Sequence, residues 1–165
     1  MVEEQKRYFI DKLKKRLEEV QPIMVNSLNQ LFKGEYLSLI DICTIDDVHT
    51  FYFEYDYETL NIVVWAENKE EQVVSIQSKG IPEKLDDTIF TKASYFSLYA
   101  LEEEWGETEE GLDQFDELID LLSEEKEEVL TQWFILCWKL AKEQTVTVFQ
   151  GKFSVHDTNY RTELP

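Results

Sequence analysis

The sequence predicts one α+β domain, in which helices pack on an antiparallel sheet. Residues 36–66 alternate between apolar and polar with the period of two that is typical of strands, whereas residues 3–32 and 109–122 repeat apolar side chains at helical spacing. Residues 129–140 would be apolar on nearly every side of a helix. We therefore expect about four strands in a meander, a C-terminal strand or hairpin, and a buried central helix near 124–142.

The N-terminal segment, residues 3–20, is predicted to be an amphipathic helix. Its apolar positions recur at steps of three and four: Phe9, Ile10, Leu13, Leu17 and Val20. Pro22 is unfavourable inside a helix but suits a first turn, so we expect a second helix over residues 23–32, ended by Gly34.

The other face of this segment is basic, with six of the sixteen bases between residues 6 and 16: Lys6, Arg7, Lys12, Lys14, Lys15 and Arg16. We expect these bases to lie near the chain's own acids or to be solvated. Binding of nucleic acid or lipid is the alternative, which the acidity of the remaining chain opposes.

Four strands are predicted over residues 36–44, 48–57, 59–66 and 72–77. In the second strand, Phe51, Phe53, Tyr55 and Tyr57 fall on one face, opposite Tyr52 and Glu54. The connections between these strands are short, and parallel strands need a crossover of about a dozen residues. The strands should therefore form an antiparallel meander.

Helices are predicted again after residue 88. The first covers residues 89–105 and stops at Gly106, and the second covers residues 109–122. Ser123 precedes four charged residues and could cap the central helix at 124–142, whose first turn would then be acidic, as the helix dipole prefers.

The C-terminal part alternates again in residues 145–149 and 152–156. The intervening Gln150 and Gly151 indicate a turn, so we expect a hairpin. Residues 158–165 are polar and are expected to form a loose tail.

The net charge is the most unusual property of the composition. Thirty-five acids and sixteen bases give −19 at pH 7, and such a chain should repel nucleic acids and anionic membranes. The partners it favours are cationic: a basic protein surface or a divalent metal. The alternative is that the charge serves only solubility.

The acids concentrate between Glu102 and Glu128, where fourteen acids accompany one base, Lys126. In a helix over 109–122, the acids lie opposite the apolar stripe. We expect a surface for a cationic partner, formed by Glu102, Glu103, Glu104, Trp105, Asp113, Asp116, Glu117 and Asp120. A merely solvated helix face is one alternative. Metal binding is another, although the ligand spacing of a calcium loop is absent.

No sequence motif indicates a catalytic, cofactor or metal site. His49 and His156 are the only histidines, and no nucleophile motif accompanies them. Their spacing from Cys43 and Cys137 matches no zinc finger, and the two cysteines are expected to be buried free thiols. The prediction is a protein without cofactor or metal that is not an enzyme, and an enzyme without a recognisable motif is the third alternative.

Aromatic residues offer anchors for an interface. Tyr52, Trp65 and Trp105 are candidates, and Trp105 is favoured because it lies among acids. The other possibility is that helices cover these rings in the core. A homodimer formed through the aromatic face, with a regulatory or scaffold role, is therefore the second functional hypothesis.

The first residues lack the basic-then-apolar pattern of a signal peptide, and no apolar run reaches the length of a membrane span. We expect a cytoplasmic protein.

The layout as a whole, with residues 36–66 followed by an acidic helical middle and a late apolar helix up to Leu140, resembles the small acidic immunity proteins of bacterial polymorphic-toxin systems and related uncharacterised α+β proteins. The resemblance implies neutralisation of a cognate toxin by binding. Acidic inhibitors of cationic proteins gain association rate by electrostatic steering, which agrees with the charge.

Overall fold

The computed structural model describes residues 2–55, 62–76, 81, 98–155, 158 and 161–165. In these residues the helices are α1 (Val2–Leu31), the short 3-10 helix η1 (Ile45–Asp47), α2 (Leu98–Trp105) and α3 (Glu109–Thr145). The strands are β1 (Ser38–Leu39), β2 (Thr50–Tyr55), β3 (Ile62–Glu67), β4 (Ser75–Ile76), β5 (Gln150–Val155) and β6 (Thr162–Leu164). The α+β class is as predicted.

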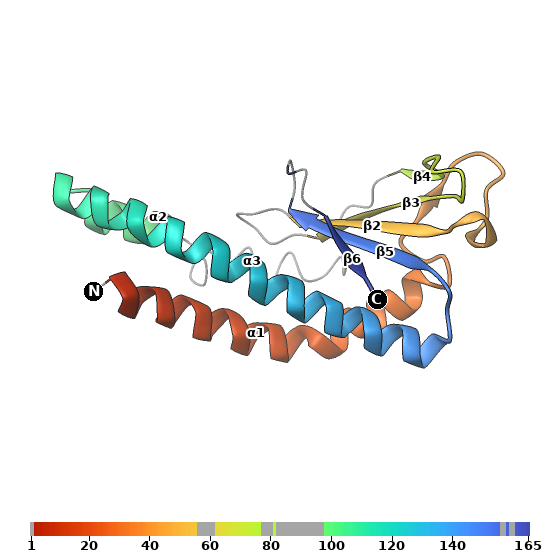
Figure 1. The fold of residues 1–165 in the computed structure, drawn as a ribbon, viewed down its shortest axis with the longest axis horizontal. Helices are drawn as coiled ribbons and strands as arrows, with labels where there is room; N and C mark the ends of the chain where they lie inside the picture. Colours follow the sequence, from red (N-terminus) through yellow and green to blue (C-terminus); the bar gives the residue numbers. More distant parts are fainter. Residues whose placement is uncertain (1, 56–61, 77–80, 82–97, 156–157, 159–160) are drawn as a thin grey trace.

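The main sheet has the strand order β3-β2-β5-β6, and the prediction of a simple meander is wrong. Strands β2 and β3 are antiparallel, as expected, but β5 pairs with β2 in parallel and β6 is antiparallel to β5. The parallel pair is possible because the chain crosses over through α3 between the two strands (Figure 1). The predicted first and fourth strands shrink to β1 and β4, which form a separate pair.

Helices α1 and α3 run side by side in the same direction, below the sheet in Figure 1. The indole nitrogen of Trp133 donates a hydrogen bond of 2.9 Å to the backbone carbonyl of Leu17, and the Asn29 amide donates one of 2.6 Å to Gln144. The apolar stripe predicted for the N-terminal helix is buried between them, including Leu13, Leu17 and Val20.

Two predicted helix boundaries are wrong. Pro22 lies inside α1, on its exposed side, where water can bond the carbonyl that the proline leaves without a donor. Ser123 does not cap a helix, because its hydroxyl donates a hydrogen bond of 2.7 Å to the carbonyl of Ile119 within α3. The cap of α3 is Thr108, whose side chain accepts from the backbone N–H of Gly111. The two predicted helices 109–122 and 124–142 are therefore one.

The main core lies between α1, α3 and the sheet. The ring of Phe134 stacks on Phe153 with centroids 4.3 Å apart and lies 4.8 Å from Phe53. The predicted buried face of β2 is confirmed, since Phe51, Phe53 and Tyr55 are buried. Tyr57, and the part of the predicted helix that covers residues 89–97, lie outside the described residues.

The central stretch of α3 is buried on only part of its circumference. Phe134, Cys137 and Trp138 are buried, as expected, but Gln132 and Leu136 are exposed. The expectation of a helix without a solvent-facing side is therefore wrong. One sheet and one neighbouring helix do not enclose the whole surface of α3.

The predicted C-terminal strand is confirmed as β5, but the predicted hairpin of residues 145–149 and 152–156 and the predicted loose tail are wrong. Residues up to Thr145 belong to α3, and the chain leaves the helix at Val146 in the left-handed conformation, at φ 50°. Gly151 lies in β5, and residues 162–164 form β6. The tail is held because the Trp138 indole N–H donates a hydrogen bond of 2.8 Å to the carbonyl of Pro165.

Gly151 marks a close contact between α3 and the sheet. A Cβ atom at this position would lie 2.9 Å from two ring carbons of Trp138 and 2.7 Å from Cδ1 of Leu164. Both neighbours are buried, so neither can move aside freely. The glycine serves packing here and forms no turn.

We expect the substitution Gly151→Ala to lower the free energy of unfolding by about 1–3 kcal/mol, because the added methyl overpacks the contact with Trp138. Urea unfolding followed by tryptophan fluorescence measures this change. Gln150→Ala, at the exposed neighbouring position, is the control and should stay within about 0.5 kcal/mol of the wild type. Equal stability of the two variants would contradict the packing role.

Candidate functional site

The candidate surface lies on α2 and the first half of α3, at the end of the molecule farthest from the sheet (Figure 1). The two helices join in a tight turn at residues 106–108. A Cβ atom at Gly111 would collide with the carbonyl oxygen of Trp105, so this glycine lets the end of α2 approach α3 closely. The apolar residues Leu118 and Leu122 pack with Ile10 of α1 and hold this end in place.

The predicted acidic residues are exposed on this end. We call the following residues the acidic surface: Glu102, Glu103, Glu104, Asp113, Asp116, Glu117 and Asp120. In the part of the chain that the structure describes, none of these seven carboxylates forms an ion pair. The structure thus brings the predicted acids together on adjoining helices and leaves their charges available to solvent.

Trp105, the predicted aromatic anchor, is half-buried. It packs against the apolar cluster of Ile10, Leu118 and Leu122, beneath the acids. Its ring therefore supports the junction of α2 with α1 and α3. Whether a partner also contacts its exposed part stays a prediction.

The acids of α3 repel one another. Asp113, Asp116, Glu117 and Asp120 form four pairs at three- and four-residue spacing along the helix. Each such pair costs about 0.2–0.5 kcal/mol, so the group destabilises the isolated helix by about 1–2 kcal/mol. A cationic partner would remove this cost.

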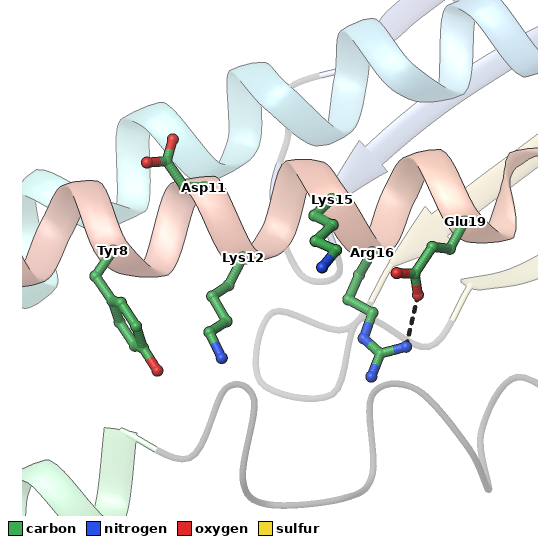
Figure 2. Close-up of a pocket in the computed structure, with 6 residues that line it drawn as sticks. All are labelled: Tyr8, Asp11, Lys12, Lys15, Arg16 and Glu19. Atoms are coloured by element: carbon green, nitrogen blue, oxygen red, sulfur yellow. Dashed lines mark hydrogen bonds and ion pairs between the residues drawn. The ribbon is translucent and has the colours of Figure 1, made fainter.

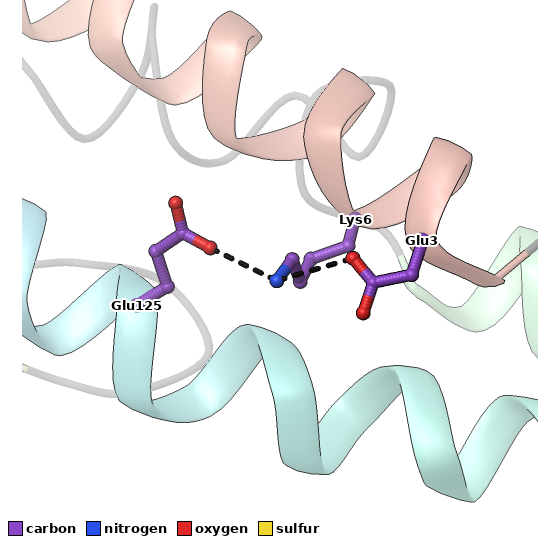
Figure 3. Close-up of polar contacts among 3 residues, drawn as sticks. All are labelled: Glu3, Lys6 and Glu125. Atoms are coloured by element: carbon purple, nitrogen blue, oxygen red, sulfur yellow. Dashed lines mark ion pairs between the residues drawn. The ribbon is translucent and has the colours of Figure 1, made fainter.

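In the described residues, an ion pair joins the N-terminal bases to the acidic stretch near its C-terminal end. The ammonium of Lys6 lies 3.3 Å from carboxylate oxygens of both Glu3 and Glu125, bridging α1 and α3 (Figure 3). The hydrogen bonds that the Lys6 ammonium donates to Glu3 and Glu125 raise the pKa of Lys6 above its ordinary value. The expectation that the bases lie near the chain's own acids is thus confirmed at Lys6.

The basic side of α1 forms a shallow pocket of about 310 Å³. Figure 2 shows Tyr8, Lys12 and Arg16 extending from one side of the helix, while Asp11 points elsewhere. Arg16 forms an ion pair of 2.7 Å with Glu19, and the ammonium of Lys12 lies 5.0 Å from the centre of the Tyr8 ring. Part of the positive charge on this side of α1 is therefore balanced by other side chains of the same helix.

Tyr52, another predicted anchor, is only 8% exposed. Its ring stacks on Trp65 with centroids 5.5 Å apart, and the guanidinium of Arg161 and the ammonium of Lys152 lie 4.9 and 5.3 Å from its centre. The interpretation of Tyr52 as an exposed anchor is wrong, because side chains of the same sheet face cover it.

Of the two histidines considered for catalysis, only His49 lies in the described part of the chain. Half-buried His49 lies just before β2, with Nδ1 3.0 Å from the hydroxyl of Thr50. His156 lies outside the described residues. Within the part that the structure describes, no three His, Cys, Asp or Glu side chains gather as a metal site would require, and no helix is long and apolar enough to cross a bilayer.

Both described cysteines are free thiols. Cys137 is buried in α3, as predicted, whereas Cys43 is only half-buried. Burial raises the pKa of Cys137 to about 12. The thiol of Cys137 is therefore protonated at neutral pH, and it stabilises the fold fully below its unfolded pKa and less as the pH rises towards 12.

At pH 8 we expect a thiol reagent to modify Cys43 readily and Cys137 at least about 100-fold more slowly, because Cys137 is protonated and enclosed. The kinetics of reaction with a chromogenic disulfide check this. Cys43→Ser should remove the fast phase, and urea should expose the slow thiol. Two equal rates in the native protein would refute the burial of Cys137.

Sequence reasoning missed a groove between α1 and α3. It has a volume of about 610 Å³ and combines apolar and acidic side chains, among them Leu136 and Glu128. The sequence does contain a signal for this groove. The polar residues Glu128 and Gln132 are four positions apart, so they lie on the same side of a helix and predict one solvent-facing edge of that helix.

No family model, curated protein or solved structure matches the chain.

Proposed function

We propose that this chain is a non-enzymatic protein that binds and blocks a basic protein partner through its acidic surface. The supporting observation is that seven exposed carboxylates lie on adjoining helices at one end of the molecule, without an ion pair in the described residues. The net charge of −19 adds a long-range attraction for cations.

The energetics of the surface favour a binding role. The repulsion among the α3 acids costs about 1–2 kcal/mol in the free protein, and Lys or Arg side chains of a partner would convert it into attraction. Complementary charge also raises the rate of encounter, which suits an inhibitor that must act before its target does.

The resemblance in layout to immunity proteins supplies the more specific form of the proposal, namely neutralisation of a cognate toxin in the cytoplasm. The free thiols of Cys43 and Cys137 are compatible with such a reducing compartment. Self-association through the aromatic face is the weaker hypothesis, since Lys152 and Arg161 cover Tyr52.

The test is binding of the purified product of the neighbouring gene, measured by stopped flow at low and physiological ionic strength. We expect an association rate that falls steeply with salt. Neutralising the α3 acids (Asp113→Asn, Asp116→Asn, Glu117→Gln and Asp120→Asn) should lower this rate by about tenfold or more.

A matched control removes the same charge elsewhere, at exposed acids distant in sequence: Glu35→Gln, Asp46→Asn, Glu70→Gln and Glu143→Gln. Its rate should fall by no more than about threefold, through net charge alone. Only the α3 variant should gain stability in urea, by about 1–2 kcal/mol. Absent binding, salt-independent binding or equal effects of the two variants would refute the proposal.

A further inference from the structure

The groove between α1 and α3 lies on the side of α3 that faces away from the sheet. Gln132 and Leu136 are about half a helical turn from Phe134, which packs on the sheet. In the part of the chain that the structure describes, the lining consists of Lys14, Leu17, Glu18, Gln21, Glu125, Glu128, Val129, Gln132, Trp133 and Leu136. Its volume, about 610 Å³, falls in the range of about 300–1,000 Å³ that is usual for ligand sites.

The floor of the groove is apolar and firmly held. Leu136 is 44% exposed, an unusual state for a large apolar residue in the middle of the most apolar stretch of the chain. Beside it, the Trp133 ring is fixed by the hydrogen bond from its indole nitrogen to the carbonyl of Leu17. Trp133 is only 8% exposed, so Leu136 is the apolar side chain of this floor that is most open to a ligand.

The rim of the groove is acidic. Among its described lining residues, Glu18, Glu125 and Glu128 are acids and Lys14 is a base. Because Lys6 pairs with Glu125, the available negative charge of the rim is that of Glu18 and Glu128. Along α3, Glu117, Glu124 and Glu128 follow one another at steps of seven and four residues, so they lie along one side of the helix. The acidic surface therefore continues along α3 to the edge of the apolar floor.

We propose that this groove takes a basic amphipathic helix of the partner, an inference that rests on the proposed function. Charge complementarity selects Lys and Arg along the flanks of the ligand, and the apolar floor selects a stripe of aliphatic side chains between them. Exposed charges mainly set the association rate, whereas buried apolar anchors set the affinity. The acidic surface attracts the partner, and the groove retains it.

A second copy of the chain fits this groove less well. A symmetric dimer would place Glu18 and Glu128 of one copy near the same rim of the other, so that like charges would meet. Nucleic acid is disfavoured by the same carboxylates.

The probes are two Leu/Lys peptides of about 18 residues, roughly five helical turns, with identical composition. In the first peptide, Leu repeats at helical spacing and forms one stripe, and in the second Leu is spread around the helix. Fluorescence anisotropy should show the striped peptide binding the full-length protein about tenfold or more tightly than its isomer.

Leu136→Asp separates the groove from simple charge attraction, because it removes the apolar contact while adding a negative charge. We expect this substitution to weaken binding of the striped peptide by about tenfold, and to leave the affinity for the isomer unchanged or slightly higher. Ile23→Asp, at a position of α1 that is 48% exposed and outside the groove lining, adds the same charge and should not weaken either peptide. Leu136→Gln repeats the test without a new charge, and urea unfolding checks that each variant is folded.

Equal affinity of the protein for the two peptides would overturn the groove proposal. So would a Leu136→Asp variant that binds the striped peptide as tightly as the wild type or more tightly. A dimer in sedimentation that Leu136→Asp dissociates would overturn it as well, by assigning the groove to a second copy. If both peptides bind equally and the α3 acid substitutions weaken them, the groove proposal fails and the proposed function survives. If neither binds even at low salt, both fail.

Discussion

The contact between Phe134 and the sheet determines how the described parts of the molecule are arranged. This ring stacks on Phe153 of β5 and touches Phe53 of β2, the two strands that pair in parallel at the centre of the sheet. The adjacent Trp133 points to α1 and bonds the carbonyl of Leu17. Two neighbouring residues of α3 thus hold the sheet on one side and the second helix on the other. Because α3 is continuous, the same contact also orients its acidic first half.

The local patterns in the sequence predicted the interior well. Alternation in β2 identified Phe51, Phe53 and Tyr55, and the stripe in α1 identified Leu13 and Leu17, since burial of one face imposes the period directly. Boundaries were harder to predict. Pro22 and Ser123 are individually unfavourable in a helix, but tertiary packing along α1 and α3 outweighs the cost of each. No Gly or Pro lies between Gly111 and Gly151, and this absence was the better indication of one long helix.

The candidate site was predictable in its charge and unpredictable in its shape. Acidic side chains are almost never buried unpaired, so the run from Glu102 to Asp120 had to be exposed. The groove depends on the position of α3 along α1. The ion pair of Lys6 with Glu125 and the hydrogen bond from Trp133 to Leu17 show which parts of the two helices lie side by side. Such a shift results from long-range packing, which no periodicity within one segment encodes. The parallel placement of β5 was missed for the same reason.

The parallel pairing of β2 with β5 also affects how the protein is made. Thr50 pairs with Gln150, so the centre of the sheet joins residues one hundred positions apart in the chain. Contacts of such separation close slowly, because the intervening chain must first be ordered. During synthesis on the ribosome, Phe51 and Phe53 emerge long before the strand that completes their environment. Before β5 is synthesised, these aromatic side chains lack their packing partner and the edge of β2 lacks its neighbouring strand. Incomplete chains with such features are prone to aggregate and are typical clients of chaperones.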